Sequence, residues 1–254
     1  MLKDDDWHFF NENGYVLIKN VLDQEHLTLI RETFIEVWDK EGPPCNQHKL
    51  LKYEPLIQLI EHAPILDNMW ALYGTQTQLL QYDFLYQPPA NEGPARSWHR
   101  DFTFPGDHPL STNAILYLED MDEEIGPTYV VPGSHRGWLQ IPQGEAKNQP
   151  LQDEVAVAAK AGDAAIINSA ILHSGSINRS KERHRRNLYM YYGHWWLKRY
   201  ESQQDLPWQC LQNASEQRLQ LLGLKQPGDL HMYAADALRT QNVKPISQER
   251  TNLV

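Results

Sequence analysis

Three residues of the sequence carry side chains that could hold a metal ion together. His99 and Asp101 lie two positions apart in the segment 97–102, SWHRDF. If this segment is a strand, both side chains point to the same side of it. A third ligand is available from His173, which follows the apolar run 164–167. Two histidines and one carboxylate form the facial triad of non-haem iron(II) oxygenases, which leaves coordination positions open for other ligands.

Taken separately, these features are common in proteins of every kind. A surface histidine beside an aspartate is frequent, and a lone histidine after an apolar strand is more often a packed side chain than a ligand. We interpret His135 as a structural residue, and His108 and His194 as packing or pocket-lining residues. The metal prediction therefore depends on the wider sequence context.

Several stretches of the chain occur together in the order typical of one enzyme family. They are WHRDF at 98–102, GPTYVVPGSHR at 126–136, HSGSINRS at 173–180 and RR at 185–186, with FNENGYV at 10–16 before them. In these stretches, which span roughly residues 9–196, the chain resembles the phytanoyl-CoA dioxygenase family of iron(II)/2-oxoglutarate oxygenases. The resemblance implies a double-stranded β-helix, a jelly roll whose mouth holds the metal.

The same resemblance implies a role for each candidate residue. It makes His99, Asp101 and His173 the iron ligands of the catalytic centre. In the family, an arginine that follows the second histidine binds the far carboxylate of 2-oxoglutarate, and we assign this role to Arg185. A carboxylate buried near iron needs a fixed, bidentate, permanently charged donor, which arginine supplies better than lysine. Arg186 would face the opposite side of the same strand.

The cosubstrate pocket and the reaction type are also implied by the resemblance. Tyr117 lies where the family often places an aromatic residue beside 2-oxoglutarate, although a position in the barrel core explains a tyrosine equally well. Halogenases of this fold keep a small residue where this chain has Asp101, so the resemblance favours hydroxylation. The expected cofactors are Fe(II), 2-oxoglutarate and O2, with release of succinate and CO2.

Periodicity and turn signals locate the elements that must position these residues. They predict a strand at 15–18, a helix at 24–39 with Asp23 as its N-cap, and a second helix that follows Pro64 and ends at Gly74. Strand-like segments follow at 77–86, 111–118, 128–131, 164–168 and 186–196, and a polar helical segment lies at about 201–240. Many strands with long loops between them favour a sandwich or barrel over a parallel α/β sheet.

These elements predict one mainly β domain over residues 1–254. Its expected core is a double-stranded β-helix, cupin-like, at about 77–196. The N-terminal helices pack against this core in the prediction, and a helical extension follows it at the C-terminus.

Composition limits the partners that are expected. The chain has 254 residues and a formal net charge of −10, and an acidic surface repels nucleic-acid phosphates and anionic lipids. The sequence contains no apolar run long enough for a transmembrane helix, no signal peptide and no peroxisomal address. We therefore expect a cytoplasmic protein with reduced thiols at Cys45 and Cys210, no nucleic-acid or membrane partner, and a small-molecule substrate.

Three functions are compatible with the sequence. We favour an Fe(II)/2-oxoglutarate-dependent dioxygenase that oxidises, and most simply hydroxylates, a small molecule of secondary metabolism. A metal-dependent cupin-type isomerase, or a dioxygenase that needs no 2-oxoglutarate, would not require Arg185. A non-catalytic binding protein would have no need to keep the set His99, Asp101 and His173. The substrate and the oligomeric state are not specified by any residue.

Overall fold

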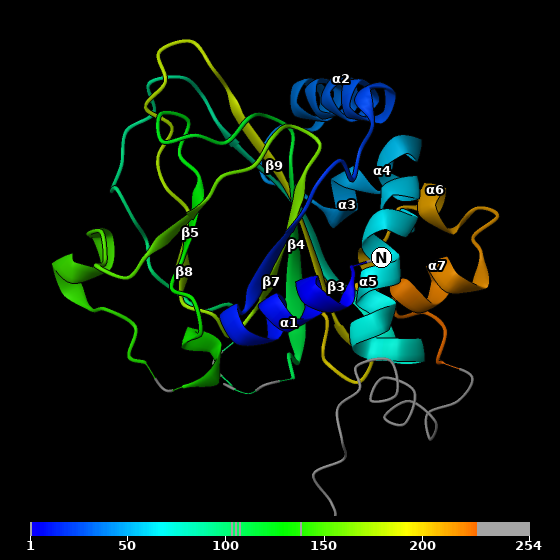
Figure 1. The fold of residues 1–254 in the computed structure, drawn as a ribbon. Coiled ribbons are helices and arrows are strands. Elements are labelled where there is room, and N and C mark those ends of the chain that lie inside the picture. Colours follow the sequence, from blue (N-terminus) through cyan, green and yellow to red (C-terminus); the bar gives the residue numbers. More distant parts are fainter. Residues whose placement is uncertain (1, 103, 105, 107, 138, 228–254) are drawn as a thin grey trace, which may run out of the picture.

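The computed structural model describes residues 2–227 except 103, 105, 107 and 138 (Figure 1). Its strands are β1 (Tyr15–Ile18), β2 (Cys45–Asn46), β3 (Thr77–Gln87), β4 (Ser111–Tyr117), β5 (Thr128–Val130), β6 (Val155–Val157), β7 (Ala164–Asn168), β8 (His173–Ser174) and β9 (Arg185–His194). They form two antiparallel sheets. Sheet A has the order β1-β7-β4-β9-β3-β2, and sheet B has the order β6-β5-β8.

Alternation along the strands gives sheet A two different faces. On β4, Ile115 and Tyr117 belong to a buried cluster that also contains Val130 of β5 and Val157 of β6, so this inner face packs against sheet B. The neighbouring residue Leu116 belongs to a second cluster, which contains the buried residues of the helices. Both faces of the central strand are covered, which explains why every residue of β4 is buried.

The helices cover the outer face of sheet A. They are α1 (Asp4–Asn13), α2 (Gln24–Glu41), α3 (Gln47–Leu50), α4 (Glu54–Leu59), α5 (Ala63–Tyr73), α6 (Trp208–Leu211) and α7 (Glu216–Leu221). Figure 1 shows α2 to α7 on the side of sheet A opposite to β5 and β8. The largest helix, α2, begins where Asp23 accepts a hydrogen bond of 2.8 Å from the backbone N–H of His26, as a capping aspartate does.

The predicted mainly β fold is correct, and so are its principal elements. The five expected strands of the core are present, the strand at 15–18 is β1, and the two expected helices are α2 and α5. The predicted core was too narrow, because β1 and β2 add to sheet A from outside 77–196. Helices α1, α3 and α4 and strands β2, β6 and β8 were not predicted, and most of them are too short to show a full hydrophobic period.

The described part of the C-terminal extension contains short helices separated by turns. α6 and α7 lie in the predicted polar segment, and the rest of that prediction, beyond residue 227, lies outside the described residues. Cys45 and Cys210 are both free and buried. Among the helices that the structure describes, none combines the length and the apolar character needed to cross a membrane.

Candidate metal centre

The side chains of His99, Asp101 and His173 converge between the two sheets. In the described part of the chain they form the one group of potential metal ligands, with one ligand atom from each residue within 4.8 Å of the others. The Oδ1 atom of Asp101 lies 3.5 Å from Nε2 of His99 and 3.6 Å from Nε2 of His173. The proximity that the sequence predicted is therefore present, and two nitrogens and one oxygen meet at one point.

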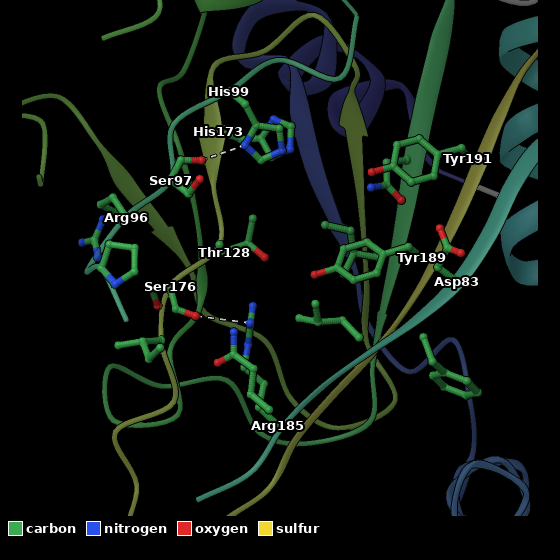
Figure 2. Close-up of a pocket in the computed structure, with 18 residues that line it drawn as sticks. Asp83, Arg96, Ser97, His99, Thr128, His173, Ser176, Arg185, Tyr189 and Tyr191 are labelled. Atoms are coloured by element: carbon green, nitrogen blue, oxygen red, sulfur yellow. Dashed lines mark hydrogen bonds between the residues drawn. The ribbon is translucent and has the colours of Figure 1, made fainter. Parts of the chain in front are cut away.

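A pair of backbone hydrogen bonds places the two histidines side by side. The N–H of His99 donates to the carbonyl of His173 at 2.9 Å, and the N–H of His173 donates back at 3.0 Å. This antiparallel bridge sends both imidazoles to the same side, with their centroids 4.2 Å apart. Figure 2 shows the two rings close together at one end of the cavity.

Each imidazole is oriented by a carbonyl group two residues earlier in the chain. The Nδ1 of His99 lies 2.8 Å from the oxygen of Ser97, and the Nδ1 of His173 lies 3.1 Å from the oxygen of Ile171. A carbonyl oxygen only accepts hydrogen bonds, so both Nδ1 atoms carry the proton. Both Nε2 atoms then keep a lone pair directed at Asp101, which is the tautomer that a metal ligand requires.

Segment 97–102 is not a strand, although the condition under which His99 and Asp101 were expected to point the same way was that it is one. Only His99 takes part in a β bridge, and Asp101 lies in a bend. The side chains still alternate, because Trp98 is fully buried with Val131 and Leu172 while Arg100 donates to backbone carbonyls of other loops. These anchors on the opposite side hold the segment extended without a neighbouring strand.

The electrostatics of the group suit a bound cation. Burial lowers the pKa of His173, which favours the neutral imidazole. Burial would raise the pKa of Asp101, but the neighbouring imidazoles of His173 and His99 and a hydrogen bond from Tyr191 bring it below its ordinary value. Burial likewise opposes the charged form of His99, yet its contacts with Asp101 and Ser97 raise its pKa overall. The Oδ2 atom of Asp101 is buried and has no hydrogen-bond partner within the described structure.

Arg185 lies at the other end of the same cavity. It is the first residue of β9, only 1% exposed, and its guanidinium donates to the carbonyl of Ser176 at 3.3 Å. Its Nε atom has no partner, and no salt bridge to Arg185 exists within the described residues. Tyr117 is fully buried nearby, donates to the hydroxyl of Thr128 at 3.2 Å, and lies within the electrostatic influence of Arg185.

Arg186 faces the opposite side of β9, as the alternation predicted. Its Nε donates to Glu119 at 2.7 Å, and its guanidinium lies 5.8 Å from the ring of Phe34 of α2. Arg186 is therefore already neutralised on the outer face of sheet A, and only Arg185 enters the cavity.

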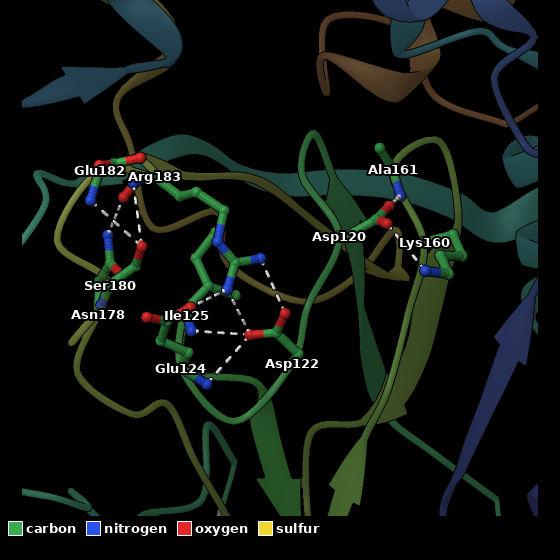
Figure 3. Close-up of polar contacts among 10 residues, drawn as sticks. All are labelled: Asp120, Asp122, Glu124, Ile125, Lys160, Ala161, Asn178, Ser180, Glu182 and Arg183. Carbon is green, nitrogen blue, oxygen red and sulfur yellow. Dashed lines mark hydrogen bonds and ion pairs between the residues drawn. The ribbon is translucent and has the colours of Figure 1, made fainter.

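The loop that leads into β9 is fixed from outside by ion pairs. Arg183 donates to both oxygens of Asp122 at 2.8 Å and to Glu124 at 2.7 Å, and its backbone N–H donates to Ser180 (Figure 3). The pairs hold the pKa of Asp122 down at about 2. Arg183 therefore lies in a turn at the surface, and this turn sets the start of the strand that carries Arg185.

A cavity of about 420 Å³ joins the two ends of the site. Sequence reasoning missed several of its lining residues, including Asp83, Asn113, Tyr189 and Tyr191. Strand alternation could have identified three of them, Asn113, Tyr189 and Tyr191. Residues 189 and 191 lie on the predicted strand 186–196, on the face opposite to Arg186 and thus on the side expected for Arg185. Residue 113 shares a face with Tyr117 on the predicted strand 111–118.

The remaining histidines that the sequence singled out lie elsewhere. His135 is buried, and its Nε2 lies 3.1 Å from the carbonyl oxygen of Asn11 at the end of α1. His108 and His194 contact each other with ring centroids 5.4 Å apart, and His194 stacks on Trp196. None of the three belongs to the metal-binding group.

Comparison of the sequence with known proteins identifies relatives of the same kind. Phytanoyl-CoA dioxygenase domain-containing protein 1 of Danio rerio is 28% identical over 150 residues, which cover 52% of this chain and 51% of that protein. L-proline trans-4-hydroxylase of Streptomyces griseoviridis is 29% identical over 150 residues, covering 44% of this chain and 56% of that protein. The chain thus spans about half the length of the curated relatives it matches.

Solved structures share the fold. HygX from Streptomyces hygroscopicus, with nickel and 2-oxoglutarate bound, superposes with a TM-score of 0.65 at 16% identity, over 79% of this chain and 90% of that one. SnoK, a non-heme alpha ketoglutarate dependent carbocyclase from nogalamycin biosynthesis, gives a TM-score of 0.62 at 25% identity, over 76% of this chain and 84% of that one. The family model of phytanoyl-CoA dioxygenase (PhyH) matches residues 10–187, which is more than half of the chain. The chain therefore belongs to the phytanoyl-CoA dioxygenase (PhyH) family.

Proposed function

We propose that the protein is an Fe(II)- and 2-oxoglutarate-dependent oxygenase that hydroxylates a small molecule. His99, Asp101 and His173 are the proposed metal ligands, and Arg185 and Tyr117 the proposed cosubstrate residues. Iron and 2-oxoglutarate, when bound, supply the oxidising power, and succinate and CO2 are the coproducts. The proteins named above include a hydroxylase and an enzyme of nogalamycin biosynthesis, which supports a role in secondary metabolism.

The observation that carries this proposal is the unpaired charge of Arg185. A guanidinium that is 1% exposed and has no carboxylate partner among the described residues calls for an anion, because a buried uncompensated charge is strongly unfavourable. The anion must fit the cavity that also contains His99 and His173. A dicarboxylate with one end at Arg185 and the other at the metal meets both demands. The alternative isomerase and 2-oxoglutarate-independent dioxygenase have no use for this arginine.

The residues of the chain position the reactants in this proposal. The carbonyls of Ser97 and Ile171 hold the two imidazoles with Nε2 toward the metal position. Arg185 and Ser176 fix the far end of the cosubstrate, because the guanidinium itself is held by the Ser176 carbonyl. Tyr191 orients the Asp101 carboxylate by a hydrogen bond. Substrate then occupies the rest of the cavity, beside the three ligands.

The experiment that tests the proposal is an anaerobic titration. Fe(II) and then 2-oxoglutarate are added to metal-free protein, and the visible charge-transfer band of a chelated 2-oxo acid is followed. We expect the band in the wild type and in Arg186→Gln. In Arg185→Gln the Kd of 2-oxoglutarate should rise at least about thirtyfold, since removing one partner of a buried charged pair costs about 2–5 kcal/mol.

Arg186→Gln is the matched control, because the two arginines are neighbours on opposite faces of β9. Iron binding without a band at saturating 2-oxoglutarate would reject the cosubstrate assignment and favour the isomerase or the independent dioxygenase. Equal affinity of both variants for 2-oxoglutarate would reject the role of Arg185.

A further inference from the structure

One wall of the cavity carries a carboxylate that the proposed reaction does not use. Asp83 lies on β3 opposite Tyr189 of β9, and its side chain lines the same cavity as His99 and His173. Figure 2 shows Asp83 on the far side of the cavity from both histidines, with Tyr189 and Tyr191 nearer to it. A molecule that fills the cavity therefore contacts both the metal centre and the neighbourhood of Asp83.

Asp83 forms no salt bridge within the described residues. Its carboxylate accepts a hydrogen bond from the side-chain amide of Gln81 and is hydrogen-bonded to the carboxyl group of Glu201. His48 lies 3.4 Å from Glu201, and Arg199 is also close enough to influence that residue. Burial raises the pKa of Asp83, and burial together with the charge of Asp83 raises the pKa of Glu201 to about 7. Both shifts have the same main physical cause, because a carboxyl group in a buried place loses the hydration that stabilises its charged form.

The two arginines of the cavity wall already have partners, one in the protein and one in the proposed cosubstrate. Arg96 forms a buried salt bridge with Glu154 and lies over the ring of Tyr129, 3.4 Å from its centroid. Arg185 lies at the opposite end, where the proposed cosubstrate binds. Apart from Arg185, whose proposed partner is the cosubstrate, Asp83 brings the one charge among the described lining residues that has no counter-charge.

A second, independent feature of the same cavity is the amide of Asn113. This residue is 1% exposed and lines the cavity from β4, directly opposite Tyr191 in the strand register. Both its Nδ2 and its Oδ1 lack a hydrogen-bond partner in the described structure. A buried amide without partners is unfavourable. Its position on the cavity wall points to a polar group of a ligand as the missing partner.

We infer that the cavity binds a substrate with a protonated amine, which Asp83 receives, and with a hydrogen-bonding group that Asn113 receives. The inference rests on the proposed function, because it names the substrate class of that same site. An ammonium group donates charge-assisted hydrogen bonds to a carboxylate, and the rings of Tyr189 and Tyr191 provide faces for a cation. An anionic substrate would be repelled by Asp83.

The test compares three probes that share one ring: cyclohexylamine, cyclohexanol and cyclohexanecarboxylate. Their binding to the protein loaded with Fe(II) and 2-oxoglutarate is measured without oxygen, by calorimetry and by the change of the charge-transfer band. We expect cyclohexylamine to bind at least about tenfold more tightly than cyclohexanol, which is the value of a charged hydrogen bond. The preference should disappear in Asp83→Asn.

The matched control is Asp120→Asn, because Asp120 is a surface aspartate that pairs with Lys160 at 2.9 Å, outside the cavity (Figure 3). This variant should keep the preference for the amine. Equal affinity for the three probes, no binding of cyclohexylamine, or an unchanged preference in Asp83→Asn would overturn the inference. Absence of the charge-transfer band before any probe is added would instead reject the proposed function, and calorimetry still reads the amine affinity in that case.

Discussion

At the scale of single residues, the site depends on which atom of each side chain is left available. The carbonyls that hold Nδ1 of His99 and His173 leave both Nε2 atoms without a backbone partner. Asp101 is 10% exposed at its side chain and brings its carboxylate to both of them. Because these two nitrogens and one carboxylate oxygen point to the same place, we expect a divalent metal ion there rather than a set of hydrogen bonds among the three side chains.

Asp101→Ala should remove one of the three proposed ligands without disturbing the histidine bridge, which is made by backbone atoms. We expect iron affinity to fall at least about a hundredfold, since even changes outside the ligand set cost 10–100-fold. Anaerobic calorimetry with Fe(II) measures the change, with Asp120→Ala as the surface control. Unaltered iron affinity and full substrate-dependent turnover in Asp101→Ala would contradict the assignment.

At the scale of elements, the loop before β5 and the loop after β8 pack closely against each other beside Arg185. Gly126 has φ +88° and precedes β5, and a Cβ atom there would lie 2.5 Å from the carbonyl oxygen of Ile177. It would also lie 2.7 Å from the hydroxyl of Ser176, the residue whose carbonyl receives Arg185. Only glycine permits both the backbone conformation and the contact.

Gly126→Ala should therefore lower the free energy of unfolding by more than about 1 kcal/mol and weaken 2-oxoglutarate binding. Gly144→Ala is the control for conformation alone, because Gly144 also has a positive φ, +59°, but nothing lies within 4 Å of its added Cβ. Chemical denaturation of the two variants measures the difference. Equal destabilisation would show that the contact with segment 176–177 contributes nothing.

At the scale of the whole molecule, Glu201 connects parts of the chain that are far apart in sequence. It follows β9, hydrogen-bonds to Asp83 of β3, and lies 3.4 Å from His48 of α3. Burial, with the charge of Asp83, raises its pKa from 4.5 to about 7, while the charge of Arg199 acts in the opposite direction. The single-domain organisation over 1–254 stays a prediction, but this contact ties the segment after β9 to the sheet.

The raised pKa of Glu201 makes stability depend on pH. Between about pH 4.5 and pH 7 the folded protein keeps a proton that the unfolded chain has lost, so the free energy of unfolding falls as pH rises through this window. In Glu201→Gln the free energy of unfolding should depend less on pH in this range. Thermal denaturation of metal-free protein at several pH values between about 4.5 and 7 measures the difference. Glu123→Gln, at an exposed position, is the control. An unchanged slope in Glu201→Gln would show that Glu201 does not hold this proton.

The sequence by itself determined the residue types of the site and the faces on which they lie. The alternation that separates Arg185 from Arg186 is a local property of any extended chain, so it could be read without a structure. The strand and helix periods also fixed the mainly β architecture. For segment 97–102 the sequence could not show whether a strand forms, because its extended shape comes from anchors on other loops rather than from a strand of its own.

Only the tertiary structure decided which distant residues meet. The bridge between His99 and His173, the unpaired amide of Asn113 and the carboxyl pair of Asp83 and Glu201 all depend on strand register. Register is set by burying two complete faces of sheet A, which is a property of the whole core and not of any segment. Burial then decides the charge of each group, because desolvation acts only once the sheets have closed around it.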